Sequence, residues 1–223
     1  MEADCPMAHM ADREKIQELK KQYEDLAVVC YINSTAELKT CADVCVTSAN
    51  ALEIVRALPN RHIFFIPDEN LGRYVASKIP DKHFIFNDGH CPVHARLSRE
   101  AVERAKKEHP GAEVLVHPEC VPEVLALADF IGSTSGIIRY AGGSSCKSFI
   151  ICTEEGVLCE LKKRNPDRQF YMVTDDFRCP DMKKVTLDKV LKVLEEGCNR
   201  VEVDPELSRT SMRPLERMLE LAR

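Results

Sequence analysis

An internal repeat constrains the fold of this chain more than any other feature of its sequence. At a fixed offset of 86 positions, residues 5–84 align without a gap with residues 91–170. Identical dipeptides recur in this one register: Cys5-Pro6 with Cys91-Pro92, Arg13-Glu14 with Arg99-Glu100, Ala42-Asp43 with Ala128-Asp129, and Pro80-Asp81 with Pro166-Asp167. Such agreement is hard to obtain by chance, so the sequence predicts two copies of one structural unit.

Each copy shows apolar runs separated by amphipathic segments, a pattern that is typical of parallel sheets covered by helices. The expected strands lie at 27–32, 63–66 and 84–86 in the first copy and at 113–116, 149–152 and 170–173 in the second. A helix over about 7–24 is expected after the first Cys-Pro. We therefore predict an α/β fold, a pseudo-threefold repeat of αβα units with short parallel sheets.

The third copy is only begun in the sequence. Cys179-Pro180 lies 88 residues after the second Cys-Pro and is followed by an expected helix at about 183–196, by Val201-Glu202-Val203 and by an expected helix at about 205–221, so this copy lacks its sheet. The expected domains are residues 1–90, opened by Cys5; residues 91–178, opened by Cys91; and residues 179–223, a partial third repeat.

The cysteines at the three Cys-Pro steps are candidate metal ligands. A thiol just before a helix start lies at the positive end of the helix dipole, which favours the thiolate. Equivalent positions of a repeated fold can converge on one axis, so we expect Cys5, Cys91 and Cys179 to ligate metal. Three thiolates are one fewer than usually close an iron–sulfur or zinc site, which leaves a metal coordination position free for substrate.

The chain has 11 cysteines, and the other eight receive weaker interpretations. Those in apolar runs (Cys30, Cys152, Cys159) are expected to be small buried hydrophobes. Two that lie four apart (Cys41, Cys45) could chelate but have no counterparts in the second copy, and three have no assigned role (Cys120, Cys146, Cys198).

Polar residues recur in register where the first strand of each copy ends. Tyr31 and Asn33 superpose on His117 and Glu119, and residues two apart in a strand point to the same side. The carboxyl ends of parallel strands are where open α/β sheets bind ligands, so these donors, acceptors and potential bases are expected to share one cavity. Each residue alone could be a satisfied strand-end polar group, but recurrence of the pair favours a site.

Hydroxyl-rich segments recur before two expected helices. Residues 47–50, with Ser48, superpose on residues 133–136, with Thr134. Helix N-termini with free N–H groups bind phosphate or carboxylate, which suggests an acidic substrate, although simple helix capping explains the same residues. A third matching pair of loops, 68–72 and 154–156, is expected to serve as turns and caps.

Bulk properties exclude several functional classes. The net charge of −5 argues against a broad nucleic-acid surface. No apolar run approaches the roughly 18–20 residues that a membrane span requires, and the N-terminus has no signal-peptide pattern. Many cysteines outside a small secreted scaffold are better explained by reduced thiols in the cytoplasm.

Several motifs together resemble those of quinolinate synthases. They are Cys-Pro-Met-Ala-His-Met (5–10), Tyr-Ile-Asn-Ser-Thr-Ala-Glu-Leu-Lys (31–39), Thr-Ser-Ala-Asn-Ala (47–51), Pro-Asp-Glu-Asn-Leu-Gly (67–72), His-Pro-Glu (117–119), Gly-Ser-Thr-Ser (132–135) and Arg-Pro-Leu-Glu-Arg-Met-Leu (213–219). The resemblance covers essentially the whole chain.

The resemblance implies a [4Fe-4S] cluster held by Cys5, Cys91 and Cys179, and condensation of iminoaspartate with dihydroxyacetone phosphate to quinolinate, the precursor of NAD, with loss of phosphate and water. It implies Glu119 as general base, with Tyr31 and His117 aiding proton transfer. It also implies substrate-binding roles for Asn33, Ser48, His94 and Thr134. L-aspartate oxidase or aspartate dehydrogenase would supply the iminoaspartate.

The family also has an N-terminal segment before the first cysteine, with a His-x-Tyr sequence, that this chain does not show. We therefore expect a truncated form with impaired activity. Two alternatives remain open: a non-catalytic metal- or anion-binding repeat protein derived from the same scaffold, and a zinc-binding α/β module, which would be colourless rather than brown.

Overall fold

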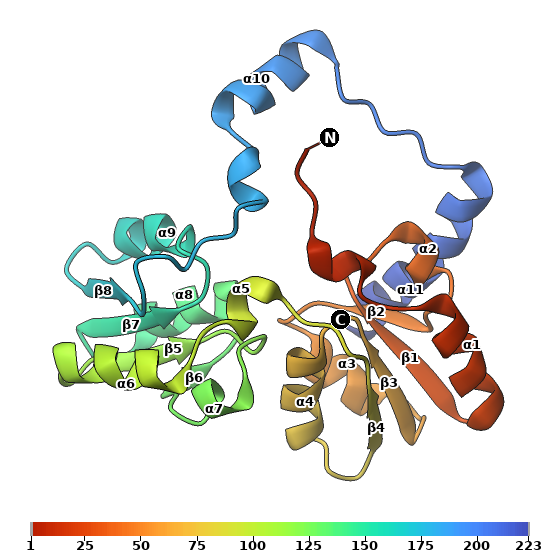
Figure 1. Cartoon of the computed structure of the whole chain (residues 1–223), viewed down its shortest axis with the longest axis horizontal. Coiled ribbons are helices and arrows are strands. Elements are labelled where there is room, and N and C mark those ends of the chain that lie inside the picture. The colour runs from red at the N-terminus through yellow and green to blue at the C-terminus, as the bar shows by residue number, and fades with distance from the viewer. Residues whose placement is uncertain (1, 223) are drawn as a thin grey trace.

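Two four-stranded parallel sheets form the body of the protein, as described by a computed structural model over residues 2–222 (Figure 1). The first sheet has the order β2-β1-β3-β4, with β1 Leu26–Tyr31, β2 Val44–Val46, β3 His62–Ile66 and β4 His83–Phe86. The second has the order β6-β5-β7-β8, with β5 Glu113–Val116, β6 Phe130–Ile131, β7 Ser148–Cys152 and β8 Gln169–Met172. The predicted α/β repeat is confirmed.

The short edge strands β2 and β6 were not predicted. They have three and two residues, too few to show a hydrophobic period. Just before each edge strand, an aspartate side chain accepts a hydrogen bond from the backbone of the central strand. Asp43 accepts a hydrogen bond from the N–H of Val28 at 2.7 Å, and Asp129 accepts one from the N–H of Val114 at 2.8 Å. Each carboxylate therefore ties the turn before an edge strand to the start of the central strand.

The helix expected over residues 7–24 is wrong in one respect, because the segment is divided in two. A 3-10 turn, η1 Pro6–His9, is followed by α1 Arg13–Gln22, and Asp12 caps α1 by accepting from the N–H of Glu14. The other two Cys-Pro segments are divided in the same way, since Ser98 and Thr186 cap their second helices. Capping residues at equivalent positions begin a new helix with a new direction.

The helices of the first unit beyond α1 are α2 Ala36–Lys39, α3 Ala51–Ala57 and α4 Glu69–Ser77. Those of the second unit are α5 Pro92–Ala95, α6 Arg99–Glu108, α7 Pro122–Leu125, α8 Thr134–Gly143 and α9 Val157–Arg164.

The C-terminal region contributes helices and, within residues 179–222, no strand. The turn η2 Met182–Lys184 leads to α10 Leu187–Glu196, and α11 Pro205–Leu221 follows. In Figure 1, α10 lies away from both sheets while α11 returns to the first unit beside α2 and β2. Met218 of α11 is buried in the first core, whereas Leu187 of α10 is 88% exposed. One helix is thus anchored, and the other leaves its apolar residues in solvent.

Each sheet is buried in a core of its own. Phe64 and Phe65 of β3 are almost fully buried in the first unit, and Phe149 and Ile150 of β7 are fully buried in the second. Burying one such side chain contributes about 1.5–3 kcal/mol to the free energy of folding. The buried residues of the first unit form a separate cluster from those of the second. The interface between them can therefore be polar.

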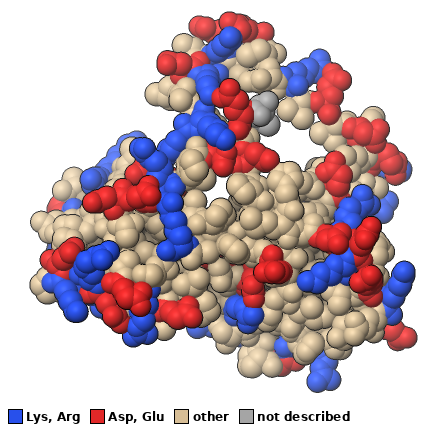
Figure 2. All heavy atoms as spheres, in the orientation of Figure 1, with Lys and Arg blue, Asp and Glu red and all other residues tan. Residues whose placement is uncertain are grey.

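The surface shows no dominant field of one sign. Positive and negative side chains are mixed over the face shown in Figure 2, in keeping with the modest net charge of −5. Among residues 2–222, no helix combines the length and the apolar composition needed to cross a bilayer.

Candidate functional site

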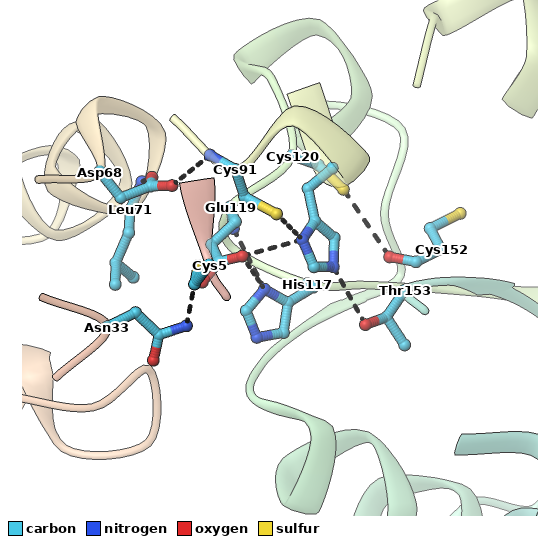
Figure 3. Close-up of polar contacts among 11 residues, drawn as sticks. Cys5, Asn33, Asp68, Leu71, Cys91, His117, Glu119, Cys120, Cys152 and Thr153 are labelled. Atoms are coloured by element: carbon cyan, nitrogen blue, oxygen red, sulfur yellow. Dashed lines mark hydrogen bonds and ion pairs between the residues drawn. The ribbon is translucent and has the colours of Figure 1, made fainter. Parts of the chain in front are cut away.

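The centre of the candidate site is the carboxylate of Glu119, which follows β5 and is 4% exposed (Figure 3). Its Oε2 lies 2.8 Å from Nδ1 of His94 and 3.8 Å from Nδ1 of His117. Both histidines are themselves buried, and their rings stack with centroids 4.6 Å apart. A buried carboxylate thus faces two imidazoles in a space largely closed to water.

Tyr31 reaches the same carboxylate from the other unit. It is the last residue of β1, is 7% exposed, and lies close enough to Glu119 and Ser48 for both to influence the pKa of its hydroxyl. The expectation that strand-end residues of the two copies approach one another holds for Tyr31 with Glu119. The cluster is therefore completed only where the first unit meets the second.

The surroundings shift the pKa values of these groups in different directions. Burial opposes ionisation of Glu119, but the hydrogen bond with His94 and the nearby imidazoles outweigh it and lower the pKa of the carboxyl to about 2. Burial lowers the pKa of His117 to about 4, and burial together with the Glu119 charge raises the pKa of Tyr31. At neutral pH the site therefore holds a carboxylate, a neutral His117 imidazole and a protonated phenol.

His94 joins the carboxylate to a cysteine. It lies three residues after Cys91 in α5, so both side chains are on one side of a helical turn. Its Nδ1 is 3.2 Å from Sγ of Cys91, and its Nε2 is 3.1 Å from Oγ1 of Thr153. Donor atoms of Cys91, His94 and Glu119 all lie within 4.8 Å of one another, a group that can hold a metal ion.

The three Cys-Pro cysteines have similar surroundings. Cys5, Cys91 and Cys179 are all partly exposed. Cys5 borders the first hydrophobic core, Cys179 borders the second, and Cys91 borders both. The amide of Asn33 lies 4.0 Å from Sγ of Cys5, which connects a predicted substrate-binding residue to a predicted ligand.

Burial outweighs any effect of the helix dipole on the thiols of Cys5 and Cys91. Burial raises the pKa of Cys5, and burial with the Glu119 charge raises the pKa of Cys91 to about 12. The turns that follow these cysteines have only four residues, too few for a strong macrodipole. A bound metal would deprotonate the thiols itself, because coordination displaces the proton.

The hydroxyl-rich segments do precede helices. Ser133 caps α8 by accepting from the N–H of Gly136 at 3.2 Å, while Thr134 is exposed. In the first unit Oδ1 of Asn50 accepts from the N–H of Thr47 at 2.7 Å, before α3. Ser48 lies near Tyr31 of the cluster, but no hydrogen bond or ion pair between the described residues joins Thr134 to Glu119.

Three residues at the site were given no functional role from sequence. Thr153 was missed altogether, since nothing in the pattern predicts its contact with His94. Asp68 and Glu154 were assigned to turns and caps. Asp68 does cap α4 through the N–H of Leu71, at 2.7 Å. Asp68 and Glu154 also contact the cysteines that open the following units, at Cys91 N and Cys179 N. Burial and the Glu119 charge raise the pKa of Asp68 to about 7.

The remaining cysteines are partly as expected. Cys30 and Cys152 are fully buried, but Cys159 is exposed on α9, so its assignment to the interior is wrong. The helix turns its side chain outward although the segment is apolar around it. Cys45 is the register partner of Cys30 in the neighbouring strand, and both are buried in the first core.

Comparisons with known proteins agree with this architecture. The family model described as NadA, quinolinate synthetase A protein, matches residues 1–220. The chain is 48% identical over 221 residues to the quinolinate synthase of Caldicellulosiruptor bescii, covering 99% of this chain and 73% of that protein. It is 48% identical to those of Fusobacterium nucleatum and Clostridioides difficile, covering 73% and 72% of their lengths. This chain belongs to the quinolinate synthase family.

Proposed function

We propose that this protein condenses iminoaspartate with dihydroxyacetone phosphate to form quinolinate, releasing phosphate and water. The observation that carries the proposal is the buried Glu119 carboxylate, faced by His94 and His117 from its own unit and by Tyr31 from the other. Family membership supports the reaction class, and the geometry supports a proton-transfer centre between the units.

Glu119 is the general base in this proposal. With a pKa of about 2 it is ionised but weakly basic while His94 is bonded to it. An anionic substrate group that draws the His94 proton away would raise the basicity of Glu119 as the substrate binds. Tyr31 donates from its hydroxyl, and the neutral His117 ring is free to accept or pass a proton.

The proposed binding residues surround this centre at its polar rim. His94 would have to exchange its contact with Glu119 or Thr153 for a carboxylate or phosphate oxygen, and the Ser48 hydroxyl near Tyr31 is proposed to meet another. Asn33, exposed near Cys5, and Thr134, exposed at the start of α8, are proposed as further anion contacts. Helix starts suit such anions because their N–H groups are free.

The donor set suits a [4Fe-4S] cluster, which we propose is held by Cys5, Cys91 and Cys179. Each cysteine is partly exposed, each opens one unit, and Cys91 borders both cores between the other two. When bound, the cluster would supply a Lewis-acidic iron with a position free of protein ligands. Glu119 and His94 are beside Cys91, so the base and a substrate contact are next to the proposed iron site.

The test is anaerobic reconstitution of the chain with iron and sulfide, followed by a quinolinate assay with both substrates. L-aspartate oxidase or aspartate dehydrogenase is the proposed source of iminoaspartate, in the cytoplasm. The 223-residue chain by itself is expected to turn over weakly, because residues 179–222 form no sheet and α10 leaves Leu187 and its other apolar residues uncovered. Robust turnover by this chain would contradict that last expectation.

A second candidate function is a non-catalytic metal- or anion-binding protein on the same scaffold. The observation that favours it is α10, whose Leu187 and Leu194 are exposed. Iron and sulfide retained without quinolinate formation would identify this alternative.

A further inference from the structure

The two αβα units contact the cysteine that opens the following unit in the same way. In the first unit Oδ2 of Asp68 accepts a hydrogen bond from the N–H of Cys91 at 3.0 Å. In the second unit Oε1 of Glu154 accepts one from the N–H of Cys179 at 3.3 Å. Asp68 and Glu154 occupy equivalent positions of the repeat, 86 residues apart, although one side chain is longer than the other.

A second hydrogen bond accompanies each of these contacts. The N–H of Glu69 donates to the carbonyl of Gly89 at 2.7 Å, and the N–H of Glu155 donates to the carbonyl of Phe177 at 2.9 Å. Gly89 and Phe177 each lie two residues before the cysteine. In each unit, the side chain of the acidic residue accepts from the N–H of the cysteine. The N–H of the residue after it donates to the carbonyl two positions before the cysteine. We call this pair of bonds the acidic clamp.

Both clamps are built into buried structure. Asp68 is fully buried and Glu154 is 9% exposed. A Cβ added to Gly89 would lie 2.6 Å from the carbonyl oxygen of Pro67, so only glycine allows the chain to approach the first clamp this closely. Buried carboxylates are costly unless they accept hydrogen bonds, which indicates that these two are retained for the bonds they make.

We propose that Asp68 and Glu154 are positioning residues for the iron–sulfur cluster, each reaching from one unit to fix the backbone of the cysteine that opens the next. This inference rests on the proposed cluster ligation by Cys91 and Cys179. Fixing the backbone limits where each sulfur can lie before the cluster assembles. Loss of a residue that orients a metal ligand typically weakens metal binding about 10–100-fold.

The two clamps differ in whether a cation pairs with the carboxyl group, and this difference should affect the reduction potential of the cluster. Glu154 is paired with Lys183 at 2.9 Å, whereas no described Lys, Arg or His forms a salt bridge with Asp68. At a pH well above 7, where the Asp68 carboxyl with its pKa of about 7 is ionised, removing this charge beside Cys91 should shift the reduction potential of the cluster to more positive values. Removing the carboxylate paired with Lys183 should shift it less.

The experiment compares five variants of the reconstituted chain. Asp68→Ser keeps a capping hydroxyl for α4 but is too short to reach Cys91, and Glu154→Ala removes the acceptor of the second clamp together with its charge. The exchanged variants Asp68→Glu and Glu154→Asp test rescue, because each introduces the residue that the other unit uses. Asp12→Ala is the matched control, since it removes the cap of α1 without contacting a cysteine.

The measurements are iron and sulfide per chain, the rate of cluster loss to a ferrous chelator, and the reduction potential. Asp68→Ser and Glu154→Ala are expected to lose cluster about 10-fold faster than the parent chain. The exchanged variants should lose it more slowly than these two. Equal loss rates for Asp68→Ser and Asp12→Ala, or unchanged potentials in both clamp variants, would overturn the proposal.

Amide hydrogen exchange of the metal-free chain separates this proposal from the proposed function. The N–H groups of Cys91 and Cys179 should exchange slowly in the parent chain and faster in the respective clamp variant. A parent chain that takes up no iron would overturn the proposed function and the positioning role with it, while slow exchange at both amides would still establish the clamp. Fast exchange in the parent chain would overturn the clamp itself.

Discussion

His117 makes the stability of the metal-free chain depend on pH in a way that can be calculated. Burial lowers its folded-state pKa from 6.5 to about 4, so the folded protein resists a proton that the unfolded chain accepts. The stabilisation is complete above pH 6.5 and declines as the pH falls toward 4. A difference of about 2.5 pKa units corresponds to about 3.4 kcal/mol in full, and about 2 kcal/mol of it is lost by about pH 5.

The perturbation that isolates this contribution is His117→Gln. The glutamine oxygen can replace Nδ1 as acceptor for the N–H of Glu119, a bond of 3.3 Å, so the fold should persist. Urea unfolding at about pH 8 and about pH 5 gives the loss of unfolding free energy on acidification for each protein. The parent chain should lose about 2 kcal/mol more than the variant, since the variant has no imidazole to protonate.

Comparing the two proteins cancels the other titrating groups, of which Asp68 is the most important. Its folded-state pKa is raised from 3.8 to about 7, so it favours the folded protein as the pH falls and opposes the effect of His117. The control is His90→Gln, which makes the same replacement at an exposed histidine. If His117→Gln and the parent lost the same free energy within about 0.5 kcal/mol, the burial argument for His117 would be refuted.

Three further outcomes are expected. Glu119→Gln should lower the turnover of an active, reconstituted enzyme by about 10²–10⁴-fold while iron content is unchanged, and a fall in iron content instead would assign Glu119 to the metal. Asp43→Ala removes the acceptor for the Val28 N–H, at 2.7 Å, and should cost about 1–2 kcal/mol of unfolding free energy, measured with urea; no change would mean that water replaces it. Phe149→Ala empties a fully buried position in the second core and should cost about 3–5 kcal/mol by the same measurement, so a cost below about 1 kcal/mol would contradict tight packing there.

The sheets could be predicted from sequence because apolar runs recur at equivalent positions of the two copies, so a strand predicted in one copy supports the strand predicted in the other. The strands at 63–66 and 113–116 are close to β3 and β5 as observed. The two edge strands could not be predicted, because two or three residues carry no period. The division of the first helix could have been predicted, because aspartate is a favoured N-cap residue. Asp12 accepts a hydrogen bond from the N–H of Glu14, two positions later.

The site was predictable as a set of residue types but not as a set of contacts. The strand-end rule identifies Tyr31 and Glu119 without specifying how the two units are oriented, and their contact depends on that orientation. The raised pKa of Cys91 arises from burial and from the Glu119 charge, neither of which is visible in the dipeptide Cys91-Pro92. Thr153 follows a buried strand with no repeated polar partner, so only the coordinates show that it binds His94.

The contacts between the two units should couple binding of the iron–sulfur cluster to the arrangement of the units. Tyr31 of the first unit meets Glu119 of the second, and Asp68 of the first holds the backbone of Cys91. The buried residues of the two units form separate clusters that both touch Cys91, so these polar contacts add to the packing around Cys91 in holding the units together. A cluster bound by cysteines of different units would favour only the orientation in which these contacts form. Its binding free energy would therefore stabilise the approach of Tyr31 to Glu119, and loss of the iron–sulfur cluster would loosen this approach along with the proposed metal site.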